Sequence, residues 1–113
     1  MLGLPPKVEH ILFARADIQW NQRIVIEWMK GKGFEVKEVA SYTVSAHLNF
    51  RYSFLSFFAM GRPKMEWHVL FTEEGRVTIR SSYDYDSLFG TAFNDFGRQR
   101  RYISELEQIF KTT

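Results

Sequence analysis

The chain has no cysteine among its 113 residues. Disulfide bonds, cysteine-ligated zinc, iron–sulfur clusters and thiol chemistry are therefore excluded. The absence also fits a reducing compartment, so the sequence predicts a cytoplasmic protein. A large charge imbalance is missing too, because 15 Lys and Arg stand against 13 Asp and Glu. The resulting net charge of +2 does not by itself indicate a nucleic acid or an anionic membrane as the partner.

Long apolar runs are missing as well. The longest apolar-looking stretch, Tyr52 to Met60, is less than half the length of the roughly 20 residues that a membrane-spanning helix needs. The first ten residues lack the basic segment and the uninterrupted apolar run of a secretory signal. We therefore expect no membrane partner and no targeting segment.

Catalytic and ligand-binding motifs do not occur in the sequence. It contains no G-x-S-x-G, no G-x-G-x-x-G and no Walker pattern. The three histidines, His10, His47 and His68, are dispersed and lack metal-ligand spacing. Glu66 precedes His68 by two residues, and we interpret this pair as polar residues on the solvent side of a strand. The sequence thus predicts neither a bound metal nor a cofactor.

Aromatic residues, by contrast, are abundant: the chain has 11 Phe, 5 Tyr and 3 Trp. With 45% hydrophobic residues, the composition is typical of a packed globular protein. We predict one domain over residues 1–113, in which residues 1–7 form an irregular arm because of the Pro5-Pro6 pair. The excess of Phe implies either a core of large rings or an apolar surface for a partner.

The first half of the chain predicts one helix and one ambiguous segment. Asp17 is a good N-cap, and apolar residues recur at helical spacing from Asp17 to Lys30. Gly31 and Gly33 are expected to end this helix. The segment Val8 to Ala14 is either a short strand or the first turns of a helix. The seven-residue spacing of Ile11, Ile18 and Val25 favours the helix, whereas the N-cap at Asp17 favours a separate helix after the segment, so both alternatives stay open.

From Phe34 the apolar residues recur with a period of two, which indicates strands. The best hairpin has Gly75 in its turn. The run Ser53 to Met60 has apolar residues on both faces, so it is either a covered central strand or the part of the sheet that meets a partner. The predicted strands lie within Phe34 to Val39, Tyr42 to Arg51, Met65 to Phe71 and Val77 to Tyr83.

The last third, starting at Ser87, predicts a helix with an apolar seam. We therefore expect an α+β fold of two layers, with about four antiparallel strands between an N-terminal and a C-terminal helix. The seam consists of Phe89, Phe93, Phe96, Ile103, Leu106 and Phe110.

The polar side of the same predicted helix is the main candidate site. Gly90, Asn94 and Gly97 share this face with Arg101. A glycine inside a helix costs about 1 kcal/mol relative to alanine, so two glycines on one face suggest that something approaches the backbone there. The candidate binding residues are Asn94, Asp95, Gly97, Arg98 and Arg101.

Two charged clusters give alternative predictions. Arg98, Arg100 and Arg101 suit a nucleic acid or another anionic ligand. Asp84 and Asp86, followed by Asp95, suit either helix capping or a metal or acid–base site, and capping is the favoured interpretation.

The sequence therefore favours a small non-enzymatic binding domain. Self-association as a homodimer, or docking on another protein, is the leading prediction. Nucleic-acid or other anionic-ligand binding is one alternative, and a small metal- or acid-dependent enzyme that uses the three aspartates is the other.

Overall fold

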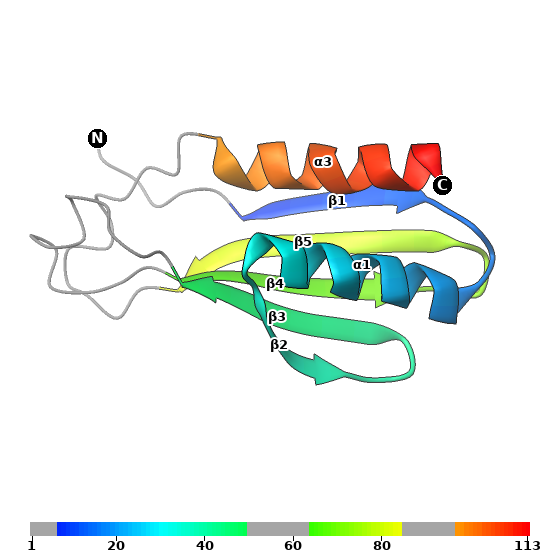
Figure 1. The fold of residues 1–113 in the computed structure, drawn as a ribbon, viewed down its shortest axis with the longest axis horizontal. Coiled ribbons are helices and arrows are strands. Elements are labelled where there is room, and N and C mark those ends of the chain that lie inside the picture. Colours follow the sequence, from blue (N-terminus) through cyan, green and yellow to red (C-terminus); the bar gives the residue numbers. More distant parts are fainter. Residues whose placement is uncertain (1–6, 50–63, 85–96) are drawn as a thin grey trace, which may run out of the picture.

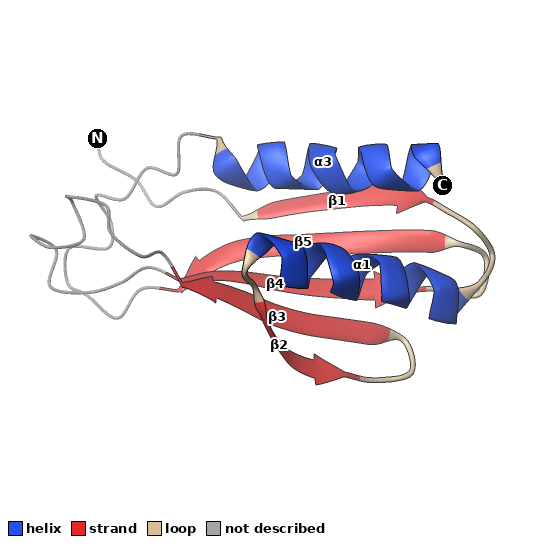
Figure 2. Cartoon of the chain, viewed as in Figure 1, coloured by secondary structure: helices blue, strands red, loops and turns tan. Residues whose placement is uncertain are grey.

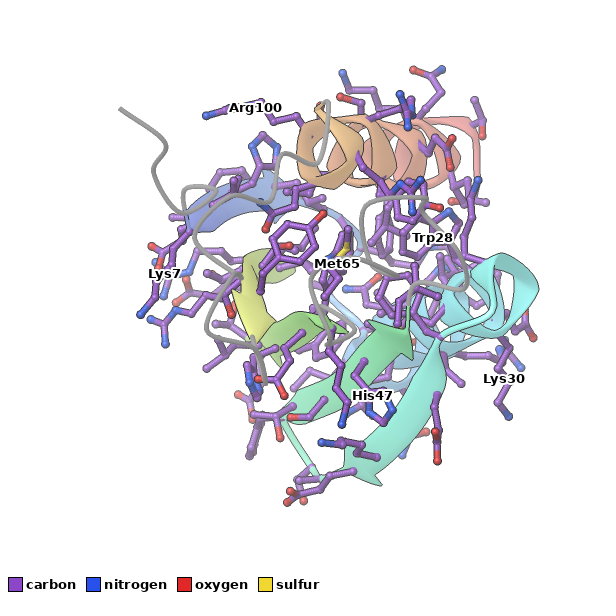
Figure 3. The ribbon with its side chains drawn as sticks, turned by 90° about the vertical axis from the view of Figure 1, so that its left-hand side faces the viewer. Lys7, Trp28, Lys30, His47, Met65 and Arg100 are labelled. Atoms are coloured by element: carbon purple, nitrogen blue, oxygen red, sulfur yellow. The ribbon has the colours of Figure 1, made fainter. Side chains whose placement is uncertain are left out.

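The structure is a computed structural model, and it describes residues 7–49, 64–84 and 97–113. Five strands form one antiparallel sheet in the order β1-β5-β4-β3-β2 (Figure 1). Two helices lie over the same face of this sheet, as the end-on view shows (Figure 3). In chain order, the elements are β1 (Val8–Phe13), α1 (Ile18–Lys32), β2 (Glu35–Val39), β3 (Thr43–Asn49), β4 (Lys64–Phe71), β5 (Arg76–Asp84) and α3 (Arg98–Thr112).

The predicted α+β architecture is confirmed, with one strand more than expected (Figure 2). The ambiguous first segment is the strand β1, so of the two alternatives for Val8 to Ala14 the structure has the strand and not the helix. Val8 and Leu12 are buried whereas Ile11 and Phe13 are exposed, which is the alternation of a strand at the border of a sheet. The partner that stabilises this conformation is β5, which lies far away in the sequence.

Helix α1 begins and ends through local capping. The side chain of Asp17 accepts a hydrogen bond from the backbone N–H of Trp20 at 3.1 Å, as expected for an N-cap. At the other end Gly33 adopts a left-handed conformation with φ 91°, and its N–H donates to the carbonyl of Lys30. The helix therefore continues to Lys32, and Gly31 lies inside it rather than ending it.

The remaining strands follow the predicted alternation. The hairpin of β4 and β5 is confirmed, with Gly75 at φ 90° in its turn. Strand β2 alternates imperfectly because its pairing with β3 shifts between Val36 and Glu38, which is a β-bulge. The run Ser53 to Met60 lies outside the described residues.

The core lies between the helices and the covered face of the sheet. Its centre is an aromatic cluster in which Trp28 of α1 stacks on Trp67 of β4, with ring centroids 5.1 Å apart. Phe34 meets the Trp67 ring edge-on at 5.4 Å, and Tyr102 of α3 meets Trp28 edge-on at 5.8 Å. Edge-to-face and offset contacts of this kind are the favoured geometries of aromatic rings. Both helices are thus anchored to one cluster.

Helix α3 confirms the later part of the apolar seam and corrects its start. Ile103 and Leu106 are buried, and Phe110 packs against the core. Gly97, however, is not inside a helix: it precedes α3 as the N-cap, in a left-handed conformation with φ 78°. The prediction of a continuous helix through Gly97 is therefore wrong, and Phe89, Phe93 and Phe96 lie outside the described residues.

Candidate functional site

The predicted binding residues fall at the start of α3. Gly97, Arg98 and Arg101 lie in the described part of the chain, whereas Asn94 and Asp95 lie outside it, as does Gly90. A Cβ atom added at Gly97 would meet no atom within 4 Å. The glycine at this position is explained by its positive φ rather than by the close approach of another group, which corrects the physical basis of the predicted site.

The arginines occupy the first turn of α3, and this turn carries no acidic residue. Arg98 is half-buried, while Arg100 and Arg101 are exposed. Neither Arg100 nor Arg101 forms an ion pair with another described residue. Of the three predicted carboxylates, the backbone of Asp84 ends β5 opposite Lys64, and Asp86 and Asp95 lie outside the described residues.

The histidines do not come together. His68 is exposed and shares a hydrogen bond of 3.0 Å with the hydroxyl of Ser45, on the solvent side as predicted. His47 is buried, and its Nε2 lies 3.2 Å from a carboxylate oxygen of Glu35. Within residues 7–49, 64–84 and 97–113, no three His, Asp or Glu side chains are placed to hold a metal ion.

A different surface stands out at the border of the sheet formed by β1. The backbone N–H of Ala14 donates to the carbonyl of Gly75 at 2.7 Å, in line with the β1–β5 register. Hydrogen-bonded pairs alternate along an antiparallel ladder, so the even-numbered residues of β1 bond to β5. The N–H and C=O groups of Glu9, Ile11 and Phe13 therefore point away from β5. No described strand pairs with them.

The side chains of these three residues lie on the face of the sheet opposite the helices. Phe13 is 78% exposed and Ile11 is 47% exposed, although both are large and apolar. Glu9 forms an ion pair with Arg80 of β5 at 2.9 Å. We call the outward backbone groups of Glu9, Ile11 and Phe13, together with their side chains, the β1 edge.

The opposite border of the sheet, β2, has a different character. Glu35, Lys37 and Glu38 are charged and exposed, and the bulge interrupts regular pairing. Charges and bulges on a border strand are common protections against pairing with another chain. The register of β1 runs without a shift from Val8 to Phe13, and the β1 edge has one charged residue. The two borders of the sheet are therefore not equivalent.

Helix α3 runs beside β1 along its length (Figure 1). His10 Nε2 lies 2.8 Å from a carboxylate oxygen of Glu107, which ties the strand to the helix. This hydrogen bond with His10 lowers the pKa of Glu107 below its ordinary value. Arg100 precedes Glu107 by seven residues, so about two helical turns place both on the same side of α3. Figure 3 shows the Arg100 side chain on the β1 side of the helix.

Sequence patterns did not identify the β1 edge. Its segment has apolar residues at both even and odd positions, so the exposed set could not be separated from the buried set without knowledge of the pairing. One signal in the sequence could have indicated the β1 edge. The segment Glu35 to Val39 is rich in charged residues, as protected border strands are, whereas the segment that forms β1 is not.

No protein-family model matches the chain, and no curated protein matches its sequence. No helix in the described part of the chain is both long enough and apolar enough to cross a membrane.

Proposed function

We propose that this chain is a non-enzymatic binding domain that docks a protein partner through the β1 edge. The observation that carries the proposal is the exposure of Phe13 and Ile11, side by side on one face of a border strand. Phenylalanine and isoleucine each contribute roughly 1.5 to 3 kcal/mol when buried, so covering them favours association. A second copy of the chain is the first partner to test, since homodimers are the commonest assemblies.

Sedimentation equilibrium from about 1 to 100 μM is the test, since interfaces of ordinary size have affinities in or below this range. If a second copy is the partner, self-association should be abolished by Phe13→Ser and should persist at high salt; a chain that stays monomeric over this range leaves the β1 edge to a segment of another protein. Val39→Ser is the matched control, because Val39 is 53% exposed on the opposite border of the sheet. Both variants should keep the stability of the parent within about 0.5 kcal/mol, since neither side chain is buried.

Two results would contradict the proposal. A loss of stability in Phe13→Ser would mean that the ring packs within its own chain. Association that responds equally to both variants would place the interface elsewhere.

The alternative function is the binding of an anionic ligand by the arginines in the first turn of α3, Arg98, Arg100 and Arg101. Its test is the affinity of the chain for a fluorescent single-stranded RNA, measured as a function of salt concentration. Contacts with phosphates weaken steeply as salt rises, whereas burial of Phe13 does not.

A further inference from the structure

We infer that the partner of the β1 edge is an extended peptide segment that adds to the sheet as a sixth strand, with apolar and acidic side chains alternating along it. This inference rests on the proposed docking function and specifies the chemistry of the partner. It has three parts: the backbone groups of β1, the apolar side chains on one side of them, and the positive charges on the other side.

The outward backbone groups of β1 can be paired by another strand. Glu9, Ile11 and Phe13 each present one N–H and one C=O outward, and no described residue pairs with them. A partner in extended conformation can form hydrogen bonds with these groups, because every second residue of a strand faces its neighbour. Peptides add to open sheets in this way. The regular register of β1 suits such pairing, whereas the bulge in β2 does not.

The face of the sheet opposite the helices selects apolar side chains. The added strand runs antiparallel to β1, as in every strand pair that the structure describes. In this arrangement, residues that hydrogen-bond directly with Ile11 and Phe13 project to the same face as these two side chains. Phe13 and Ile11 are large, apolar and exposed, so their cross-strand neighbours gain most when they are apolar too. Two apolar residues separated by one position are therefore expected in the partner.

The other face selects acidic side chains. Intervening residues of an added strand project toward α3, where Glu107 is already engaged by His10. The same side of the helix carries Arg100 in the first turn and Lys111 in the last, and both are exposed. Lys111 lies 3.8 Å from Glu107 and is 66% exposed, so it keeps donors for a second carboxylate. Arg100 and Lys111 together outweigh the one negative charge of Glu107, and this net positive charge favours glutamate or aspartate in the partner.

The probe is a synthetic seven-residue peptide with blocked ends that alternates valine and glutamate. We expect it to bind the full chain, and a valine–lysine peptide to bind at least tenfold more weakly. Binding is followed by calorimetry and by amide hydrogen exchange. Exchange at Glu9, Ile11 and Phe13 should slow on binding, whereas the amides of His10 and Leu12 are already bonded to β5 and should change little.

Methylated peptides separate strand pairing from simple apolar contact. Methylation of the valine amides removes the donors that face β1, and we expect at least a tenfold loss of binding. Methylation of the glutamate amides, which face away, should change binding by less than twofold. Arg100→Glu should weaken binding of the valine–glutamate peptide at least fivefold. Arg101→Glu, one residue further around the helix, is the matched control and should have a smaller effect.

The outcomes distinguish the two levels of the proposal. Equal effects of both methylations, with binding still lost in Phe13→Ser, would overturn strand addition and leave docking through the β1 edge intact. Peptide binding that is unaffected by Phe13→Ser would overturn the docking surface itself. A peptide concentration of about 1 mM detects even weak complexes. If the valine–glutamate peptide does not bind at this concentration, the inferred partner chemistry is overturned.

Discussion

Substitution of Gly75 by alanine should be among the most damaging single-methyl changes in this protein. Gly75 has a φ of 90° in the turn between β4 and β5. A Cβ atom there would lie 2.6 Å from the carbonyl oxygen of Ala14 and 3.1 Å from the carbonyl group of Arg15. All of these are backbone atoms of the connection between β1 and α1, so they cannot move aside as the end of a flexible side chain can.

Two costs add at this position. A left-handed conformation costs an alanine about 1 to 2 kcal/mol relative to glycine. The backbone shift that relieves an overpacked site costs about 1 to 3 kcal/mol more. We therefore expect Gly75→Ala to reduce the free energy of unfolding by about 2 to 5 kcal/mol. The shift also disturbs the 2.7 Å hydrogen bond between Ala14 and Gly75, which continues the β1–β5 ladder.

Two other glycines serve as controls in the same urea denaturation assay. Gly97 has a φ of 78° but open space around its Cβ position. Gly97→Ala should therefore lower the free energy of unfolding only by the cost of the left-handed conformation, about 1 to 2 kcal/mol. Gly31 lies in α1 with nothing within 4 Å, so Gly31→Ala should stabilise the protein by up to about 1 kcal/mol. Two results would refute this account of the glycines: a loss of stability in Gly75→Ala no larger than that in Gly97→Ala, or a Gly31→Ala protein less stable than the parent.

Three further predictions concern α3. Ending the chain at Asp95 removes the two buried apolar side chains of this helix, each worth roughly 1.5 to 3 kcal/mol, so calorimetry should show no cooperative melting near the temperature of the full chain. Because the bond from His10 lowers the pKa of Glu107, its carboxylate stabilises the fold at pH values above its ordinary pKa, and this contribution disappears as the pH falls through the lower folded value. Glu107→Gln should therefore be less stable than the parent at about pH 6, and the difference should shrink as the pH falls below the ordinary pKa of a glutamate, as measured by urea denaturation. Ser81 donates to Gln99 at 2.6 Å in the core, so Ser81→Ala should cost about 1 to 3 kcal/mol, and the cost should shrink when Gln99 is replaced by leucine in a double-mutant cycle.

The sequence predicted elements whose determinants are local. Asp17 specifies the start of α1 through a hydrogen bond three residues away, and Gly75 specifies its hairpin turn through its own φ. The conformation of Val8 to Phe13 was not predictable in this way, because pairing with β5 decides it. The role of Gly97 was missed because a spacing pattern shows which face a residue occupies but not the sign of its φ.

The candidate site could not be predicted from local sequence patterns either, because it also depends on the tertiary fold. The exposure of Phe13 depends on which strands neighbour β1, and no local pattern carries that information. The arginines of α3 were found from the sequence because clustering of charge is visible there, and the first turn of the helix does gather them. Their proximity to a border strand, which gives Arg100 its part in the proposal, arises only from the tertiary fold.

The pairing of β1 with β5 also has a consequence for synthesis on the ribosome. Val8 pairs with Ser81, so β1 must wait for a partner that is synthesised roughly seventy residues later. At about 5 to 20 residues per second, this delay lasts several seconds, during which β2, β3 and β4 are already available to pair with one another. The nascent chain therefore carries an apolar segment without its strand partner throughout that interval. Factors that bind such segments during translation would have time to meet β1 before it pairs with β5.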